Sequence, residues 1–176
     1  QGVALACNKL GIKGTIFMPV PTPKQKLGQV HMFGGSNVEI RLTGDTFDDA
    51  YAAAQSFKDE TNSMFVHPFE DKDVVIGQAT LALELIDQAV EPIDYILVPI
   101  GGGGLISGVL HVFKTLSPQT RVIGIEPEGA PAMQQSLANG KITELNEIDP
   151  FVDGAAVRKV GEDAFTLCTS TLTSTC

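Results

Sequence analysis

The chain has 176 residues and a formal net charge of -9, from 21 acidic and 12 basic side chains. This length suits about one domain, and the apolar fraction of 43% is enough to fill a sizeable core. The acidic excess argues against nucleic acid and anionic membrane surfaces as partners, because both are bound by basic patches.

No stretch of about 18 apolar residues is present, so the sequence predicts no membrane-spanning helix, and its first residues lack the features of a signal peptide. The cysteines Cys7, Cys168 and Cys176 are odd in number and form no C-x-x-C pair. Sparse thiols of this kind are typical of a reducing compartment, and we therefore expect a cytoplasmic protein.

Short apolar runs alternate with segments of helical periodicity in the first part of the chain. Thr22, followed by Pro23, is expected to cap one helix, and Thr46 with Asp49 resembles a capping box at the start of another. The expected elements are, in order, a helix over 2–10, a strand over 15–18, a helix over 23–33, a strand over 38–42, a helix over 47–58 and a strand over 63–66.

The second part continues the alternation, with a helix over 74–89, a strand over 94–100, a helix over 105–116, a strand over 121–126 and helices over 131–139 and 161–168. This order predicts an α/β fold with a mostly parallel, doubly wound open sheet. A change of composition at residues 67–73 marks a seam, which divides a small βα domain over 1–73 from part of a larger domain over 74–168. The Ser/Thr-rich residues 169–176 are expected to form an irregular tail.

Four consecutive glycines, Gly101, Gly102, Gly103 and Gly104, separate the strand over 94–100 from the helix that follows. Amides without side chains at a helix N-terminus suit an anion, because their N–H groups point at it and the helix dipole places positive charge there. We expect a phosphate monoester. An ordinary tight turn with close packing is the alternative interpretation.

Two common nucleotide motifs do not fit this loop. The dinucleotide fingerprint G-x-G-x-x-G would require glycine in place of Ile106 or Ser107. A nucleoside-triphosphate loop would end in Gly-Lys-Ser/Thr, and no lysine occurs between Lys72 and Lys114.

The chain also carries a series of short motifs that are specific as a set. They are Gln-Gly-Val-Ala at 1–4, Phe-Met-Pro at 17–19, Thr-Gly-Asp-Thr-Phe-Asp at 43–48, His-Pro-Phe at 67–69, the glycines with leucine at 101–105, Gly-Ile-Glu-Pro at 124–127 and Val-Asp-Gly-Ala-Ala-Val at 152–157. In this order and spacing the chain resembles the threonine dehydratase (threonine deaminase) family, pyridoxal-phosphate enzymes of the tryptophan-synthase β fold, fold type II. The similarity covers residues 1 to about 168.

The resemblance implies that the amides of Gly101, Gly102, Gly103, Gly104 and Leu105 hold the 5'-phosphate of pyridoxal phosphate, in a cofactor-binding domain over 74–168. It implies a lyase of amino-acid metabolism that removes water and ammonia from threonine to leave 2-oxobutanoate, on the route to isoleucine. It also implies a small-molecule substrate, threonine or serine, and a homo-oligomer in the full-length form.

The Schiff-base lysine of this family lies in a segment upstream of the point where this chain begins, so no catalytic residue is assigned within it. Lys58 ends a partial copy of that motif at 56–58, but the following letters differ and the lysine is expected to be a solvated cation at a helix end. We therefore expect an internal fragment that is inactive alone. A non-catalytic α/β module that binds a nucleotide or another phosphorylated ligand is the alternative.

Three further positions are notable. His67 is expected to bond to the backbone of its own loop rather than to a ligand. Glu126 stands where related racemases bind a divalent cation, but Ala132 occupies the place of a second carboxylate, so no metal is expected. Asp153 and Gly154 match a family segment near the cofactor's edge.

Overall fold

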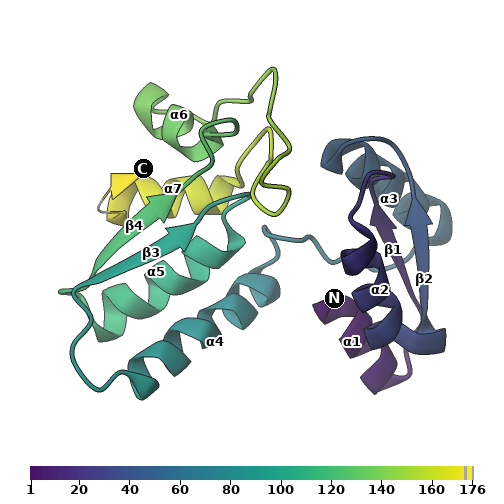
Figure 1. Ribbon diagram of the computed structural model, residues 1–176, viewed down its shortest axis with the longest axis horizontal. Helices are drawn as coiled ribbons and strands as arrows, with labels where there is room; N and C mark the ends of the chain where they lie inside the picture. Colours follow the sequence, from purple (N-terminus) through teal and green to yellow (C-terminus); the bar gives the residue numbers. More distant parts are fainter. Residues whose placement is uncertain (173, 176) are drawn as a thin grey trace. The chain divides into compact units, whose positions relative to one another are not determined.

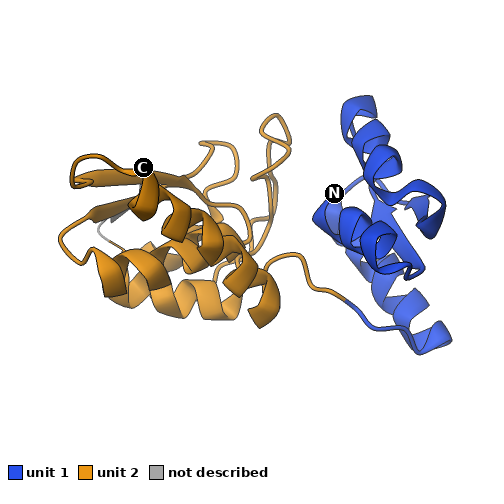
Figure 2. Cartoon of the chain, turned by 90° about the horizontal axis from the view of Figure 1, so that it is seen from below, with its two compact units in different colours: residues 1–65 blue, residues 66–176 orange. Residues whose placement is uncertain are grey.

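The structure, a computed structural model, describes residues 1–172 and 174–175. The chain folds into two compact units, Gln1–Phe65 and Val66–Cys176 (Figures 1 and 2). The division lies immediately before the seam expected at residues 67–73, so that segment belongs to the second unit.

The first unit is built from parallel strands and the helices that connect them. Strand β1 (Gly14–Met18) pairs with β2 (Val38–Leu42) in parallel, as the alternation predicted. The predicted capping box is confirmed, because the Thr46 hydroxyl accepts the Asp49 N–H while the Asp49 carboxylate accepts the Thr46 N–H. The remaining elements are the helices α1 (Gly2–Leu10), α2 (Lys24–Gly34) and α3 (Phe47–Thr61) and the 3-10 turn η1 (Gly35–Asn37).

Two local expectations in this unit are wrong. Thr22 does not cap α2, because Pro23 takes the capping position and the Thr22 hydroxyl donates to the Pro19 carbonyl instead. Residues 63–66 do not form a strand, and Met64 is 91% exposed. A strand needs a hydrogen-bonded neighbour, and no strand in the described part of the chain pairs with this segment.

The second unit holds a parallel sheet with the strand order β3-β4-β5, of which β3 and β4 are labelled in Figure 1. Strand β3 (Tyr95–Pro99) pairs with β4 (Arg121–Ile125), and the short β5 (Ser174–Thr175) pairs with the other side of β4. Helix α5 (Gly104–Leu116) connects β3 to β4 and packs along α4 (Lys72–Gln88). The unit also contains α6 (Ala132–Asn139) and α7 (Glu162–Thr171).

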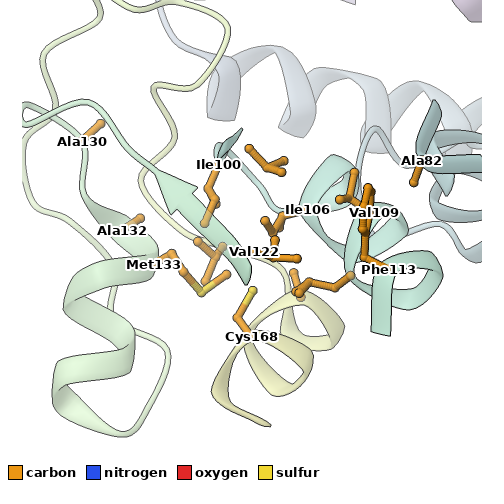
Figure 3. Close-up of a cluster of buried hydrophobic side chains, with 14 of the residues drawn as sticks. Ala82, Ile100, Ile106, Val109, Phe113, Val122, Ala130, Ala132, Met133 and Cys168 are labelled. Atoms are coloured by element: carbon orange, nitrogen blue, oxygen red, sulfur yellow. The ribbon is translucent and has the colours of Figure 1, made fainter. Parts of the chain in front are cut away.

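The core of this unit lies between the sheet and helix α5. Ile106, Leu110 and Phe113 are fully buried on one face of α5, at the spacing of successive helical turns. They meet Val122 of β4 and Cys168 of α7 in the same cluster (Figure 3). This core fixes α5 against β3 and β4, the strands that precede and follow it in the sequence. The position of the loop between β3 and α5 is therefore fixed as well.

The C-terminal segment differs from the irregular tail expected over 169–176. Helix α7 continues through Thr171, and Ser174–Thr175 form β5, while positions 173 and 176 lie outside the described residues. The hydroxyl groups are satisfied within the helix, because those of Thr169 and Thr171 donate to the carbonyls of Phe165 and Leu167 one turn earlier.

None of the helices within residues 1–172 and 174–175 combines the length and the apolar character needed to cross a bilayer.

Candidate anion site at the start of helix α5

The glycine loop runs from the end of β3 into the first turn of α5. Ile100 extends the sheet, because its N–H donates to the Ile125 carbonyl at 2.8 Å. Gly103 then turns the chain with φ +104°, a backbone conformation that side-chain-bearing residues rarely adopt, and α5 begins at Gly104. The sequence prediction of a strand, a glycine turn and a helix is confirmed.

The N–H groups of this loop are its main chemical feature. In the part of the chain that the structure describes, no protein acceptor is paired with the N–H groups of residues 101–106. Gly102, Gly103, Gly104 and Ile106 are nevertheless buried. Buried backbone donors are normally satisfied, so a run of them at the positive end of a helix suits an anion that accepts several hydrogen bonds at once.

The carbonyl groups of the same loop are held in place. The Gly102 carbonyl accepts the Gly161 N–H at 2.9 Å, and the Gly103 carbonyl accepts both the N–H and the hydroxyl of Ser107, at 3.0 and 2.8 Å. A trans peptide points its C=O and the following N–H in opposite directions. These bonds therefore direct the N–H groups of Gly103 and Gly104 away from Gly161 and Ser107.

Close neighbours explain why all four positions are glycine. A Cβ on Gly102 would lie 2.4 Å from the Phe69 ring, and one on Gly103 would lie 2.3 Å from the Ala164 Cβ. At Gly101 and Gly104 the nearest atoms, the Cα atoms of Ala155 and Phe69, would be 3.1 and 3.0 Å away. Close packing, the alternative interpretation of the loop, thus accounts for the missing side chains, but it leaves the N–H groups without acceptors.

His67 organises the segment that lies against the loop. Its Nδ1 accepts the N–H groups of Phe69 and Glu70, at 3.3 and 2.9 Å, which confirms the predicted histidine bonded to its own backbone. The imidazole packs edge-on against the Phe69 ring with 4.7 Å between the centroids. Burial lowers the pKa of His67 below its ordinary value of 6.5, against the opposing effect of the Glu70 and Asp71 carboxylates.

The lowered pKa of His67 predicts a loss of stability in acid. A folded state with a lowered histidine pKa binds fewer protons than the unfolded state, so stability is full above pH 6.5 and declines as the pH falls through that value. In His67→Asn the amide oxygen can accept the same N–H groups without titrating. We expect the free energy of unfolding, measured with urea from about pH 7.5 to about pH 5, to fall less in the variant than in the parent chain. Equal pH dependence in the two chains would contradict this assignment.

Glu126 caps a helix. Its two carboxylate oxygens accept the N–H groups of Met133 and Gln134, both at 2.7 Å, at the start of α6. Burial raises the pKa of Glu126, while these hydrogen bonds oppose the rise. Among the described residues, no group of three histidine, cysteine, aspartate or glutamate side chains is placed to hold a metal ion.

The structure also shows the surroundings of three other residues that the sequence singled out, Cys168, Lys58 and Gly154. Cys168 is buried, and burial raises the pKa of its thiol to about 12, so it remains protonated and unreactive. Lys58, in the first unit, lies 3.4 Å from the Asp59 carboxylate with a side chain that is 45% exposed, as expected for a solvated cation near a helix end. Gly154, from the family motif at 152–157, contributes a carbonyl that would lie 3.4 Å from a Cβ on Gly101.

Sequence reasoning missed the residues that hold the loop from outside. Ser107, Glu70 and Gly161 were not assigned a role, although Ser107 stands four residues after Gly103, at the distance of one helical turn. Glu70 and Gly161 offered no such local signal, because they reach the loop only through the tertiary fold.

The chain is similar to known proteins along nearly all of its length. The family model of pyridoxal-phosphate dependent enzymes matches residues 1–175. The chain is 52% identical over 168 residues to an L-threonine dehydratase biosynthetic IlvA from Halalkalibacterium halodurans, covering 96% of this chain and 40% of that protein. It is 48% identical over 165 residues to the protein of the same name from Bacillus subtilis, covering 94% and 39%. The chain therefore spans about 40% of the length of these relatives.

Solved structures confirm the α/β fold class. The processed form of threonine deaminase isoform 2 from Solanum lycopersicum superposes with a TM-score of 0.88 at 39% identity, over 99% of this chain and 50% of that one. Maize serine racemase superposes with a TM-score of 0.88 at 34% identity, over 98% and 51%. The resemblance to threonine dehydratases found in the motifs is thus confirmed over nearly the whole chain.

Proposed function

We propose that this chain, which belongs to the family of pyridoxal-phosphate dependent enzymes, supplies the phosphate site of a threonine dehydratase. The observation that carries the proposal is the run of N–H groups at residues 101–106 with no acceptor in the described chain. Relatives named L-threonine dehydratase support the reaction, in which L-threonine yields 2-oxobutanoate and ammonia.

In this proposal the amides of Gly101, Gly102, Gly103, Gly104 and Leu105 hold the 5'-phosphate of the cofactor. The residues fit the group, because the loop offers several N–H donors and no side chain at the positive end of a helix. Pyridoxal phosphate, when bound, supplies a conjugated ring that draws electrons from the bonds at the α-carbon of an amino acid. The loop anchors and orients the phosphate, and Phe69 packs against Gly102 and Gly104 of the loop.

We assign no catalytic residue within these 176 residues. The reaction needs an amine placed to move the α-proton, and neither Lys58 nor any other lysine is assigned that role here. The chain alone is therefore expected not to convert threonine. The proposal includes a cytoplasmic lyase of isoleucine biosynthesis, a threonine or serine substrate and a homo-oligomeric full-length form. The names of the relatives, a biosynthetic L-threonine dehydratase and a threonine deaminase, support the amino-acid substrate.

Binding of the chain to pyridoxine 5'-phosphate tests the phosphate site. This probe has no aldehyde that could react with surface amines, so it reports anchoring alone. We expect it to bind at least about tenfold more tightly than pyridoxine. Pyridoxine lacks the phosphate and therefore cannot make the charge-assisted hydrogen bonds to the loop. Equilibrium dialysis measures both affinities, and equal affinities would remove the basis of the proposal.

A chimera tests the reaction. The matched part of the relative from Halalkalibacterium halodurans, 40% of that protein, is replaced by the present chain. We expect the chimera to form 2-oxobutanoate from threonine and the chain alone to form none. A folded chimera that binds the probe but stays inactive would favour the alternative, a non-catalytic module for phosphorylated ligands.

A further inference from the structure

We propose that Glu70 is a positioning residue for the glycine loop, acting through the start of helix α7. Its carboxylate holds Gly161 and Glu162 in place, Gly161 holds the Gly102 carbonyl, and that carbonyl sets the direction of the next N–H, on Gly103. The inference rests on the proposed function, since it concerns the same loop.

Two consecutive N–H groups at the start of α7 carry the connection. The N–H of Glu162 donates to Glu70 Oε1 at 2.8 Å, although the two residues are 92 positions apart. The preceding N–H, of Gly161, donates to the Gly102 carbonyl at 2.9 Å. A Cβ on Gly161 would lie 2.8 Å from the Glu70 Cγ, so the glutamate side chain lies directly against this glycine.

The Glu70 side chain is itself held by His67. Nδ1 of the imidazole accepts the Glu70 N–H, which leaves the ring proton on Nε2, and Nε2 lies 3.4 Å from Glu70 Oε2. One carboxylate oxygen thus faces the imidazole while the other faces the start of α7. Phe69, between these two residues, lays its ring against Gly102, so the same short segment contacts the loop directly through Phe69 and indirectly through Glu70 and Gly161.

The consequence concerns the direction of one N–H group. With the Gly102 carbonyl bonded to Gly161, the peptide between Gly102 and Gly103 cannot rotate without breaking a hydrogen bond. Without Glu70, the start of α7 loses an acceptor and Gly161 loses the atoms that fix it. The Gly103 N–H would then no longer be oriented in advance for a phosphate, which costs affinity without removing any group that touches the ligand.

The test compares four variants of the 176-residue chain. Glu70→Ala removes the acceptor, and Glu70→Asp keeps the charge but is one methylene too short to reach Glu162. In Glu70→Gln the amide oxygen can still accept the Glu162 N–H. Glu126→Ala is the matched control, because it removes another carboxylate that accepts two N–H groups at a helix start, that of α6 rather than α7.

Two readouts are measured, and the first needs no ligand. Hydrogen exchange of the Gly161 amide is expected to accelerate at least about tenfold in Glu70→Ala and Glu70→Asp, and to stay near the parent value in Glu70→Gln and Glu126→Ala. Affinity for pyridoxine 5'-phosphate is expected to fall about tenfold in the same two variants only. Rescue by the amide, but not by the shorter carboxylate, distinguishes positioning from charge.

Each outcome is decisive. Unchanged Gly161 exchange in Glu70→Ala overturns the inference, and so does unchanged affinity in a chain that binds the probe. If Glu70→Ala does not fold, Glu70→Asp decides by the same two criteria. If the parent chain does not bind the probe, the proposed function falls, while Gly161 exchange still decides whether Glu70 positions the loop.

Discussion

Replacing Gly103 by alanine is expected to lower the free energy of unfolding of the second unit by about 3 kcal/mol, as the sum of backbone strain and overpacking. At φ +104° a side-chain-bearing residue is strained. The new Cβ would also lie 2.3 Å from the Ala164 Cβ, an atom fixed on α7 that has no rotamer to change. The loop would have to move, so affinity for pyridoxine 5'-phosphate should be lost as well. Urea denaturation and equilibrium dialysis measure the two effects.

Gly140→Ala is the matched control for this prediction. Gly140 also has a positive φ, +65°, but a Cβ there would meet no atom within 4 Å. Both substitutions reduce the entropy of the unfolded chain equally, so the difference between them reports the contact with Ala164 together with the greater backbone strain at φ +104°. We expect Gly140→Ala to cost about 1 kcal/mol, from strain alone, and to leave probe binding unchanged. Equal losses of stability in the two variants would mean that Ala164 can move away from the new Cβ without a cost in stability.

The glycine loop was predictable because its signals are local. The apolar run over 94–100, the glycines and the apolar spacing of Ile106, Leu110 and Phe113 all lie within one short stretch, and each acts on the backbone next to it. The parallel pairing of β3 with β4 also followed from the intervening helix, since parallel strands need such a crossover.

The surroundings of the loop were not predictable, because they come from segments distant in sequence. The motifs at 67–69 and 152–157 marked two of these segments. No sequence pattern, however, predicts that Phe69 lies against Gly102 or that Ala155 lies against Gly101. The same limit explains the wrong prediction of a strand over 63–66, since a strand depends on a partner elsewhere in the chain.

The end of helix α7 was missed for a different reason. Serine and threonine compete with the helix by bonding to nearby backbone, and their accumulation after Cys168 indicated an irregular tail. In the structure the hydroxyl of Thr169 bonds back to a carbonyl of the helix itself, so the same tendency is satisfied without ending the helix. Composition alone does not distinguish these two outcomes.

The contact between α4 and α5 gives the second large prediction. Gly108 lies in the middle of α5, where alanine would ordinarily stabilise the helix by about 1 kcal/mol. Here a Cβ would lie 2.6 Å from the Ala79 nitrogen and 2.8 Å from the Val75 carbonyl oxygen, both backbone atoms of α4. Backbone cannot change rotamer, so the two helices must separate, which costs packing along their whole contact. We expect Gly108→Ala to lower the free energy of unfolding by about 2 kcal/mol, despite the better helix propensity.

Gly77→Ala, in the middle of α4, separates propensity from packing. Gly77 is exposed, and a Cβ there would meet no atom within 4 Å, so only the gain in helix propensity remains. We expect this variant to be more stable than the parent chain by about 0.5 to 1 kcal/mol, measured by the same urea denaturation. Two glycine-to-alanine changes in the interiors of neighbouring helices should therefore have opposite signs. If Gly108→Ala also stabilised the chain, α4 and α5 would not pack as closely as their backbone contact requires, and the position of the anion site at the start of α5 would lose one of its supports.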